Sequence, residues 1–139
     1  MPQVYRYFLV LGCFGAGLSI GWGAFAAHSL QARLSEKMLM AFQTGTDYQA
    51  YHCLAILVLV GLATSDKSNV STGYFKVALA LMLLGMILFS GSLYALAITG
   101  MSSLGMITPI GGVLLLIAWA VAIVAVWHLG KQHIDGDRQ

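Results

Sequence analysis

Charged residues are so widely spaced along this chain that long apolar segments dominate its pattern. No charged residue lies between Lys76 and Lys131. A helix of about 20 apolar residues crosses a bilayer core, so this uncharged run is long enough for two spans. Small and polar residues interrupt the run at 99–105. We therefore predict two membrane-spanning helices, at about 73–98 and 109–129, joined by a short polar turn.

Two further spans are predicted upstream of that run. The chain has two earlier uncharged stretches, which predict spans at about 7–27 and 48–64. The last of the four spans also has a recognisable start. Thr108 is a suitable N-cap, and Pro109 fits the first turn of a helix, where its missing N–H costs nothing.

Composition supports a single membrane domain that covers residues 1–139. Hydrophobic residues make up 59% of the chain and charged residues 9%, whereas soluble domains contain about 25% charged residues. The predicted fold class is all-α, an integral membrane four-helix bundle. The formal net charge of +2 is small and dispersed, so we expect no binding of nucleic acid.

An amphipathic stretch separates the first two predicted spans. Leu30, Leu34, Met38 and Phe42 recur every four residues, and the polar and charged residues between them fall mostly on other faces. This pattern predicts an amphipathic helix that lies in the membrane interface. The alternative is a loop helix that packs on the bundle.

The distribution of Lys and Arg predicts the orientation in the membrane. With four spans, the N-terminus, the middle loop and the C-terminal tail share one side. Positively charged residues are concentrated on the cytoplasmic side of membrane proteins, so both termini should be cytoplasmic. The side of the termini carries Arg6, Lys67, Lys76, Lys131 and Arg138, and the other side carries Arg33 and Lys37.

Small residues recur at helical spacing and predict close helix–helix contacts. Gly17 and Gly21 form a GxxxG pattern, which lets two helix backbones approach closely. Contacts within the chain are the favoured interpretation, and contacts with a second copy are the alternative. The residues predicted to pack in this way are Gly17, Gly21, Gly85, Ser92, Gly111 and Gly112.

Polar side chains inside the predicted spans are the candidate functional residues, because desolvating them is costly unless they find partners. On the predicted topology they all fall in the outer half of the membrane or at its outer surface. We expect them to meet in one outward-facing polar pocket for a ligand or partner; the alternative is purely structural hydrogen bonding. These residues are His28, Tyr48, Tyr51, His52, Ser90, Tyr94 and Thr108.

Signatures of chemistry are otherwise scarce in the sequence. The spans contain no predicted carboxylate, because Glu36 and Asp47 are expected on the outer loop. No P-loop, Gly-x-Ser-x-Gly, His-Glu-x-x-His or dinucleotide fingerprint is present. His28 and His52 could ligate a haem, but two histidines without a third ligand or a carboxylate partner are a weak signal. We therefore predict no catalytic residue and no metal site, and the cofactor stays open.

Four phrases in this order and spacing resemble the YgdD/YwdK-like family of small bacterial inner-membrane proteins. They are GAFAAH at 23–28, YQAYH at 48–52, SGSLY at 90–94 and TPIGG at 108–112. The resemblance covers nearly the whole chain, although Ala26 stands where members of the family often have glycine. It implies a four-helix protein of the bacterial plasma membrane and implies no reaction.

Three functions remain open at this point. A non-enzymatic accessory or assembly protein is favoured, with the lipid bilayer around it and a membrane-protein partner or a second copy against its small-residue seams. The second is a carrier or channel for a small solute or ion, acting as an oligomer. The third is a membrane subunit that binds haem or quinone at its histidines.

Overall fold

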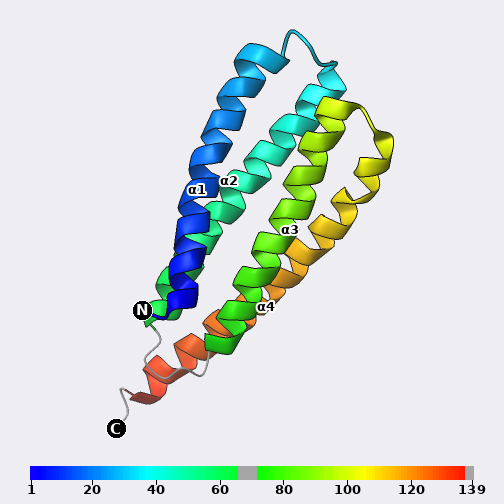
Figure 1. Cartoon of the computed structure of the whole chain (residues 1–139). Helices are drawn as coiled ribbons and strands as arrows, with labels where there is room; N and C mark the ends of the chain where they lie inside the picture. The colour runs from blue at the N-terminus through cyan, green and yellow to red at the C-terminus, as the bar shows by residue number, and fades with distance from the viewer. Residues whose placement is uncertain (66–71, 137–139) are drawn as a thin grey trace.

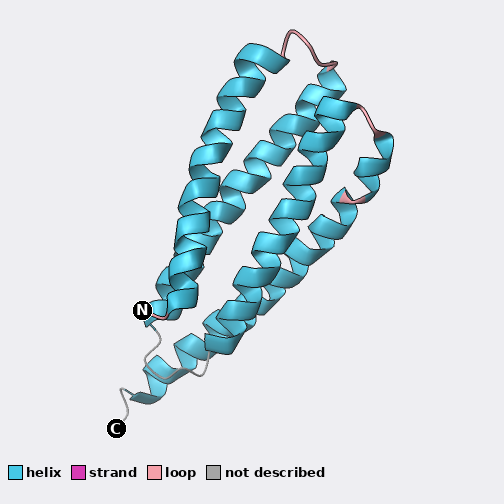
Figure 2. Ribbon diagram, viewed as in Figure 1, coloured by secondary structure: helices cyan, strands magenta, loops and turns pink. Residues whose placement is uncertain are grey.

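Four long helices make up most of the computed structural model, which describes residues 1–65 and 72–136. Figure 1 shows them side by side, with the start of α1 and the end of α4 at one end, called here the terminal end. Short segments at the opposite, distal end connect α1 to α2 and α3 to α4 (Figure 2). The elements are α1 (Gln3–Phe25), the π-turn η1 (Ala26–Leu30), α2 (Glu36–Ser65), α3 (Thr72–Thr99), the 3-10 turn η2 (Ser102–Met106) and α4 (Thr108–Gly136).

The predicted all-α membrane bundle is confirmed, because four helices in the described ranges are long and apolar enough to cross a membrane. Each long helix packs mainly on its neighbour in the sequence: α1 on α2, α2 on α3, and α3 on α4. The other pairs of long helices make few or no backbone contacts within the described residues. The arrangement therefore leaves room for a groove between α1 and α3 and another between α2 and α4.

The interior contains two groups of buried apolar side chains. The smaller group, at the distal end, includes Ala26, Leu30, Phe42 and Ala97. The larger group lies toward the terminal end and joins all four long helices. Its buried members include Tyr5, Ile56, Val60, Phe75, Leu79, Met82, Ala118, Ala122 and Ala125.

The amphipathic stretch between the first two spans is not a separate helix. Its later residues form the first turns of α2, and its apolar side chains pack into the distal core rather than standing apart from the bundle. Phe42 is fully buried, with its ring 6.0 Å from Trp22 and 4.7 Å from Tyr94 between centroids. Packing on the bundle, the alternative interpretation, therefore describes this segment.

The start of α2 differs from the sequence prediction in a way that changes the depth of the polar residues. The helix begins at Glu36, so Asp47 lies within it and not on an outer loop. Tyr48 stands 12 residues, or about 18 Å, along α2. The helix can run through Asp47 because that side chain is exposed, while Gly45 on another face packs against α3. Tyr48 and its neighbours therefore lie near the middle of a long helix.

The boundaries of α3 and α4 follow local signals. Gly100 ends α3 in the left-handed conformation, with φ of 70°, and its N–H donates to the Leu96 carbonyl at 2.9 Å. Helix α4 begins at Thr108, as the Thr-Pro pair predicts. At its other end α4 continues to Gly136, beyond the expected stop near Leu129. The limits of the spans in a bilayer stay a prediction.

Candidate functional site

A groove of about 510 Å³ opens between α2 and α4, with α3 at its back. Its walls are largely aromatic and aliphatic, and the polar groups come from α2 and from one tryptophan of α4. The residues that line this α2–α4 groove are Tyr48, Tyr51, His52, Phe89, Gly112, Leu115, Leu116 and Trp119.

His52 is the buried polar group of this groove, and its partners fix its protonation. Its Nδ1 lies 2.7 Å from the carbonyl oxygen of Tyr48, which can only accept a hydrogen bond. The indole Nε1 of Trp119, which can only donate, lies 3.3 Å from His52 Nε2. The ring is therefore neutral, with its proton on Nδ1. Because both nitrogens are engaged, His52 offers no free lone pair to haem iron or another metal while Trp119 stays in place.

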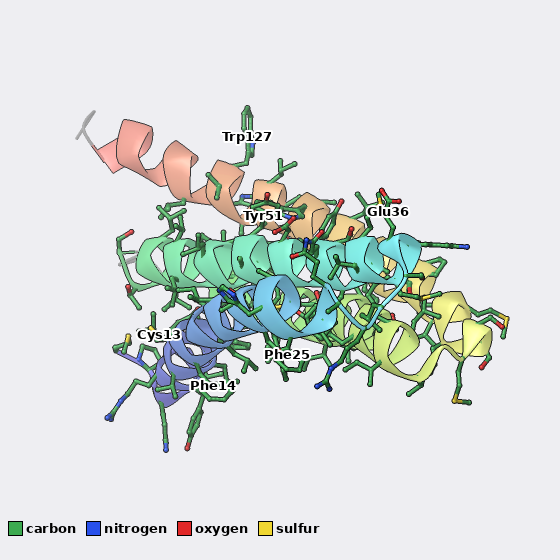
Figure 3. All side chains as sticks on the ribbon, turned by 90° about the horizontal axis from the view of Figure 1, so that it is seen from above. Cys13, Phe14, Phe25, Glu36, Tyr51 and Trp127 are labelled. Atoms are coloured by element: carbon green, nitrogen blue, oxygen red, sulfur yellow. The ribbon has the colours of Figure 1, made fainter. Side chains whose placement is uncertain are left out.

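Aromatic rings surround the His52 side chain. Tyr48 stacks on Phe89 with ring centroids 4.5 Å apart and lies 5.9 Å from the His52 ring. Tyr51 stands at the rim, 62% exposed, between α2 and α4 (Figure 3). The groove thus combines flat aromatic faces with tyrosine hydroxyls at its edge.

A second groove, of about 320 Å³, lies on the other side of the α2–α3 pair, between α1 and α3. Its polar groups bind one another. The Tyr94 hydroxyl donates to Gln49 Oε1 at 2.9 Å, and Gln49 Nε2 donates to the Gly15 carbonyl at 2.8 Å. Gln49 is 6% exposed. This α1–α3 groove therefore contains a hydrogen-bonded clamp that joins three helices.

Two serines of α3 have different surroundings. Ser92 forms a 2.8 Å hydrogen bond with the Thr108 hydroxyl and so connects α3 to the start of α4. Ser90 is 2% exposed and lines the α1–α3 groove, but its hydroxyl has no hydrogen-bond partner. Rotation toward the carbonyl of the preceding turn is open to any helical serine, so this hydroxyl marks no ligand on its own.

The structure does not bring the predicted polar residues into one pocket. Tyr48, Tyr51 and His52 face the α2–α4 groove, whereas Ser90 and Tyr94 line the groove on the opposite side of the α2–α3 pair. Thr108 is bonded to Ser92 and lines neither groove, and His28 is exposed in η1. Sequence spacing shows which residues share a face of one helix, but it does not show which neighbouring helix that face meets. The polar residues therefore divide between two grooves and do not meet in one pocket.

Sequence reasoning missed two residues that complete these sites, Gln49 and Trp119. Both carry a detectable signal. An amide in the middle of an apolar helix needs partners, and so does the indole N–H of a tryptophan inside a span. Which partner each one takes depends on tertiary packing.

Some of the glycines predicted to pack make close contacts in the structure, and others make none. A Cβ on Gly85 would lie 3.0 Å from Leu115, and one on Gly111 would lie 2.8 Å from Phe89 Cα. Gly17 and Gly21, in contrast, are exposed, with no atom within 4 Å of a Cβ built there. The prediction that these two glycines pack within the chain is wrong.

Other glycines of α1 make the contacts with α2. A Cβ on Gly12 would lie 2.8 Å from Leu57, and one on Gly15 would lie 2.5 Å from the sulfur of Cys53. The GxxxG spacing correctly marks a helix surface of small residues. It could not show that the opposite face of α1 makes the contacts with α2.

Comparison with known proteins places the chain in a family. Residues 22–112 match the family model described as "Protein of unknown function (DUF423)". "UPF0382 membrane protein YwdK" of Bacillus subtilis is 43% identical over 120 residues, which cover 86% of this chain and 95% of the relative. "UPF0382 membrane protein SERP0230" of Staphylococcus epidermidis is 41% identical, with 86% and 94% covered.

A third relative, "UPF0382 membrane protein SAB0533" of Staphylococcus aureus, is 40% identical over 88% of this chain and 96% of its own length. No solved structure matches. The match to the family model, residues 22–112, includes the phrases YQAYH of α2 and SGSLY of α3 and ends before Trp119. The resemblance inferred from four short phrases is thus confirmed, and the chain belongs to the DUF423 family as a multi-pass membrane protein.

Proposed function

We propose that this protein is a non-enzymatic accessory or assembly protein of the bacterial inner membrane, which binds a transmembrane helix of another protein on the outer face of α1. The observation that carries the proposal is the open GxxxG pattern. Gly17 and Gly21 have no atom within 4 Å of a built Cβ, whereas Gly12 and Gly15 of the same helix are in tight contact.

The residues around these glycines support packing of a partner helix. Small residues form a stripe along the exposed face, and the larger exposed side chains of Phe14 and Ile20 flank it. Lipid does not drive helices together, so close backbone approach and packing supply the attraction. The stripe contains Cys13, Gly17, Gly21, Ala24 and His28, all exposed.

Helix α1 is also the least covered of the four. Only 17% of its most apolar window is buried, against 28% to 39% for the other three helices. A helix that packs mainly on one neighbour in its own chain has much of its circumference free for another protein. This asymmetry supports a binding role for α1.

The terminal half of the bundle supports binding over transport. Its described interior is filled by apolar side chains such as Ile56, Phe75, Met82 and Ala122. A path for an ion or polar solute needs polar groups or water along its length. The two polar clusters described above lie at one level of the bundle and do not extend into this half.

The orientation with both termini in the cytoplasm is part of the proposal, and the five-to-two distribution of Lys and Arg supports it. It places the distal end outside the cell membrane. Gln31, in the exposed connection between α1 and α2, is a suitable reporter. A Gln31→Cys variant in a Cys13→Ala background should react with an impermeant maleimide on intact cells; protection until lysis would contradict the orientation.

The native cysteine of the stripe allows a direct test of docking. Cys13 is exposed one turn from Gly17, and Cys53 is buried. A thiol-directed crosslinker in native membranes should join Cys13 to a partner that mass spectrometry identifies. Gly17→Leu and Gly21→Leu should each reduce the yield several-fold, because leucine fills the stripe.

Gly61→Leu is the matched control, since Gly61 of α2 is also exposed with nothing within 4 Å. Its crosslinking should equal that of the wild type. Equal yields for all three variants would overturn the proposal. A product formed only between two copies of this chain would show self-association and would contradict an accessory role.

A further inference from the structure

Asp47 is a charged residue well inside α2, a helix that is long and apolar enough to cross a membrane. It stands 11 residues, or about 16 Å, from the start of α2, and it is exposed. At about the same level, Gly45 packs against Ser90, well within α3. A carboxylate at such depth is costly in lipid and is by default a sign of function.

The position of Asp47 relates it to the α2–α4 groove. It lies one helical turn from Tyr51 on the same face of α2 and next to Tyr48, and both tyrosines line the groove. Because α2 begins at the distal end, Asp47 lies on the distal side of these tyrosines. It therefore stands one turn distal to the rim residue Tyr51, outside the set of residues that line the groove.

No positive charge within the described structure neutralises this carboxylate. Asp47 forms no ion pair with a described residue. The side chains that line the groove include no Lys or Arg, and His52 is held in its neutral form by Tyr48 and Trp119. A carboxylate thus lies beside the distal rim of the groove, and the walls of the groove carry no charged side chain.

The walls themselves suit a cation. The rings of Tyr48 and Phe89 stack on each other in one wall, and Trp119 lines the groove from α4. Aromatic faces attract organic cations, with tryptophan the strongest, and the attraction grows when water is excluded. The groove volume of about 510 Å³ falls within the usual range for small-molecule sites, roughly 300–1,000 Å³.

We infer that the α2–α4 groove binds a lipophilic organic cation: a molecule with an ammonium or other onium head and an apolar body. The head lies against the aromatic rings near the Asp47 carboxylate. The apolar body extends along Leu115 and Leu116 of α4 and reaches the groove sideways from the lipid. This site is separate from the α1 face and does not depend on the proposed helix docking.

The test compares two ions of the same shape and opposite charge. Tetraphenylphosphonium and tetraphenylborate are titrated into the purified full-length protein in micelles, with protein-free micelles subtracted. The phosphonium should bind at least about tenfold more tightly, because a carboxylate beside the rim attracts the cation and repels the anion. Equal affinities, or no binding of the phosphonium, would overturn the inference.

Two pairs of variants locate the site. Asp47→Asn should weaken phosphonium binding about tenfold and reduce the preference over borate. Glu36→Gln, the same change of charge at the exposed start of α2, should leave both affinities within about twofold. If the two variants behave alike, the effect is general surface charge, and the inference is wrong.

The second pair of variants changes the size of a side chain and leaves the charge unchanged. Leu116 lines the groove and is 71% exposed, so Leu116→Trp should block the groove without disturbing the core. Ile123, two turns farther along α4 and 69% exposed, lies outside the groove lining. Phosphonium binding should be lost in Leu116→Trp and kept in Ile123→Trp. Retained binding in the first variant would place the ion elsewhere and refute the assignment.

Discussion

The two glycine faces of α1 differ in what lies against them. Gly12 and Gly15 face α2 so closely that a methyl group would collide with Leu57 or Cys53. Gly17 and Gly21 point away from the bundle and meet nothing in the described structure. Both faces consist of small residues at helical spacing. The motif therefore identifies a surface able to pack, while the fold decides which surface is already occupied.

The α3–α4 contact is a third case, and it differs from the inner face of α1 in the kind of atom that opposes the glycine. A Cβ on Gly111 would lie 2.8 Å from Phe89 Cα and 2.9 Å from the Gly85 carbonyl oxygen. These are backbone atoms, which cannot rotate away as a side chain can. The three cases thus predict a graded response to the same small change, glycine to alanine.

Gly111→Ala should have the largest effect on stability. The added methyl group forces α3 and α4 apart, and overpacking of this kind costs about 1–3 kcal/mol. The free energy of unfolding, measured by SDS titration in mixed micelles, should fall accordingly. Gly112→Ala is the control, because its Cβ would lie 3.7 Å from the Phe89 ring, an ordinary contact. Similar losses for both variants would show that the α3–α4 contact is not specific to Gly111.

Gly15→Ala should destabilise less, by about 1 kcal/mol, because the colliding atom is the sulfur of a side chain. Removing the colliding atom tests this cause. Adding Cys53→Ala removes the sulfur and should return part of the lost free energy of unfolding. Additive losses in the double variant would mean that the collision with Cys53 does not determine the spacing of α1 and α2.

The overall architecture could be predicted because charge and hydropathy act over whole helices. The uncharged run after Lys76 required two spans, and the Thr108–Pro109 pair marked the start of α4. The start of α2 could not be predicted in the same way. Asp47 resembled a boundary, yet a charged residue can be tolerated inside a helix when its side chain is exposed. The charge of Asp47 affects only its own position, whereas the continuity of α2 depends on packing by Phe42 and Gly45.

The sites were less predictable because they depend on which helices become neighbours. The sequence correctly marked Tyr48, His52 and Tyr94 as polar groups that need partners. It could not separate His52, which faces α4, from Gln49, which faces α1 and α3. These two residues are three apart on α2, and their different partners divide one expected pocket into two grooves.

The Gln49 clamp belongs to the inner face of α1. Gln49 donates to the carbonyl oxygen of Gly15, the same glycine that packs on Cys53. Gln49→Leu and Tyr94→Phe should show a coupling of about 0.6 kcal/mol in a double-mutant cycle, the average for hydrogen bonds between membrane helices. The free energies of unfolding of the two single variants, the double variant and the wild type supply it. A coupling of zero would indicate that the 2.9 Å contact between Tyr94 and Gln49 contributes nothing.

Gly17→Ala should produce a small change of the opposite sign. Alanine favours a helix over glycine by about 0.5–1 kcal/mol when no contact opposes it, and the outer face of α1 is open. The free energy of unfolding of the isolated protein should therefore rise slightly. Gly61→Ala, at an equally open position of α2, should rise by the same amount.

The sign of this last change distinguishes an open face from an occupied one. If Gly17→Ala lost stability as Gly15→Ala does, another helix would have to lie against Gly17 in the purified protein, and that helix could belong only to a second copy. A gain in the isolated chain together with reduced crosslinking through Cys13 in native membranes would separate the two roles of glycine. The inner face of α1 would then serve the fold, and the outer face would serve a partner present only in the membrane.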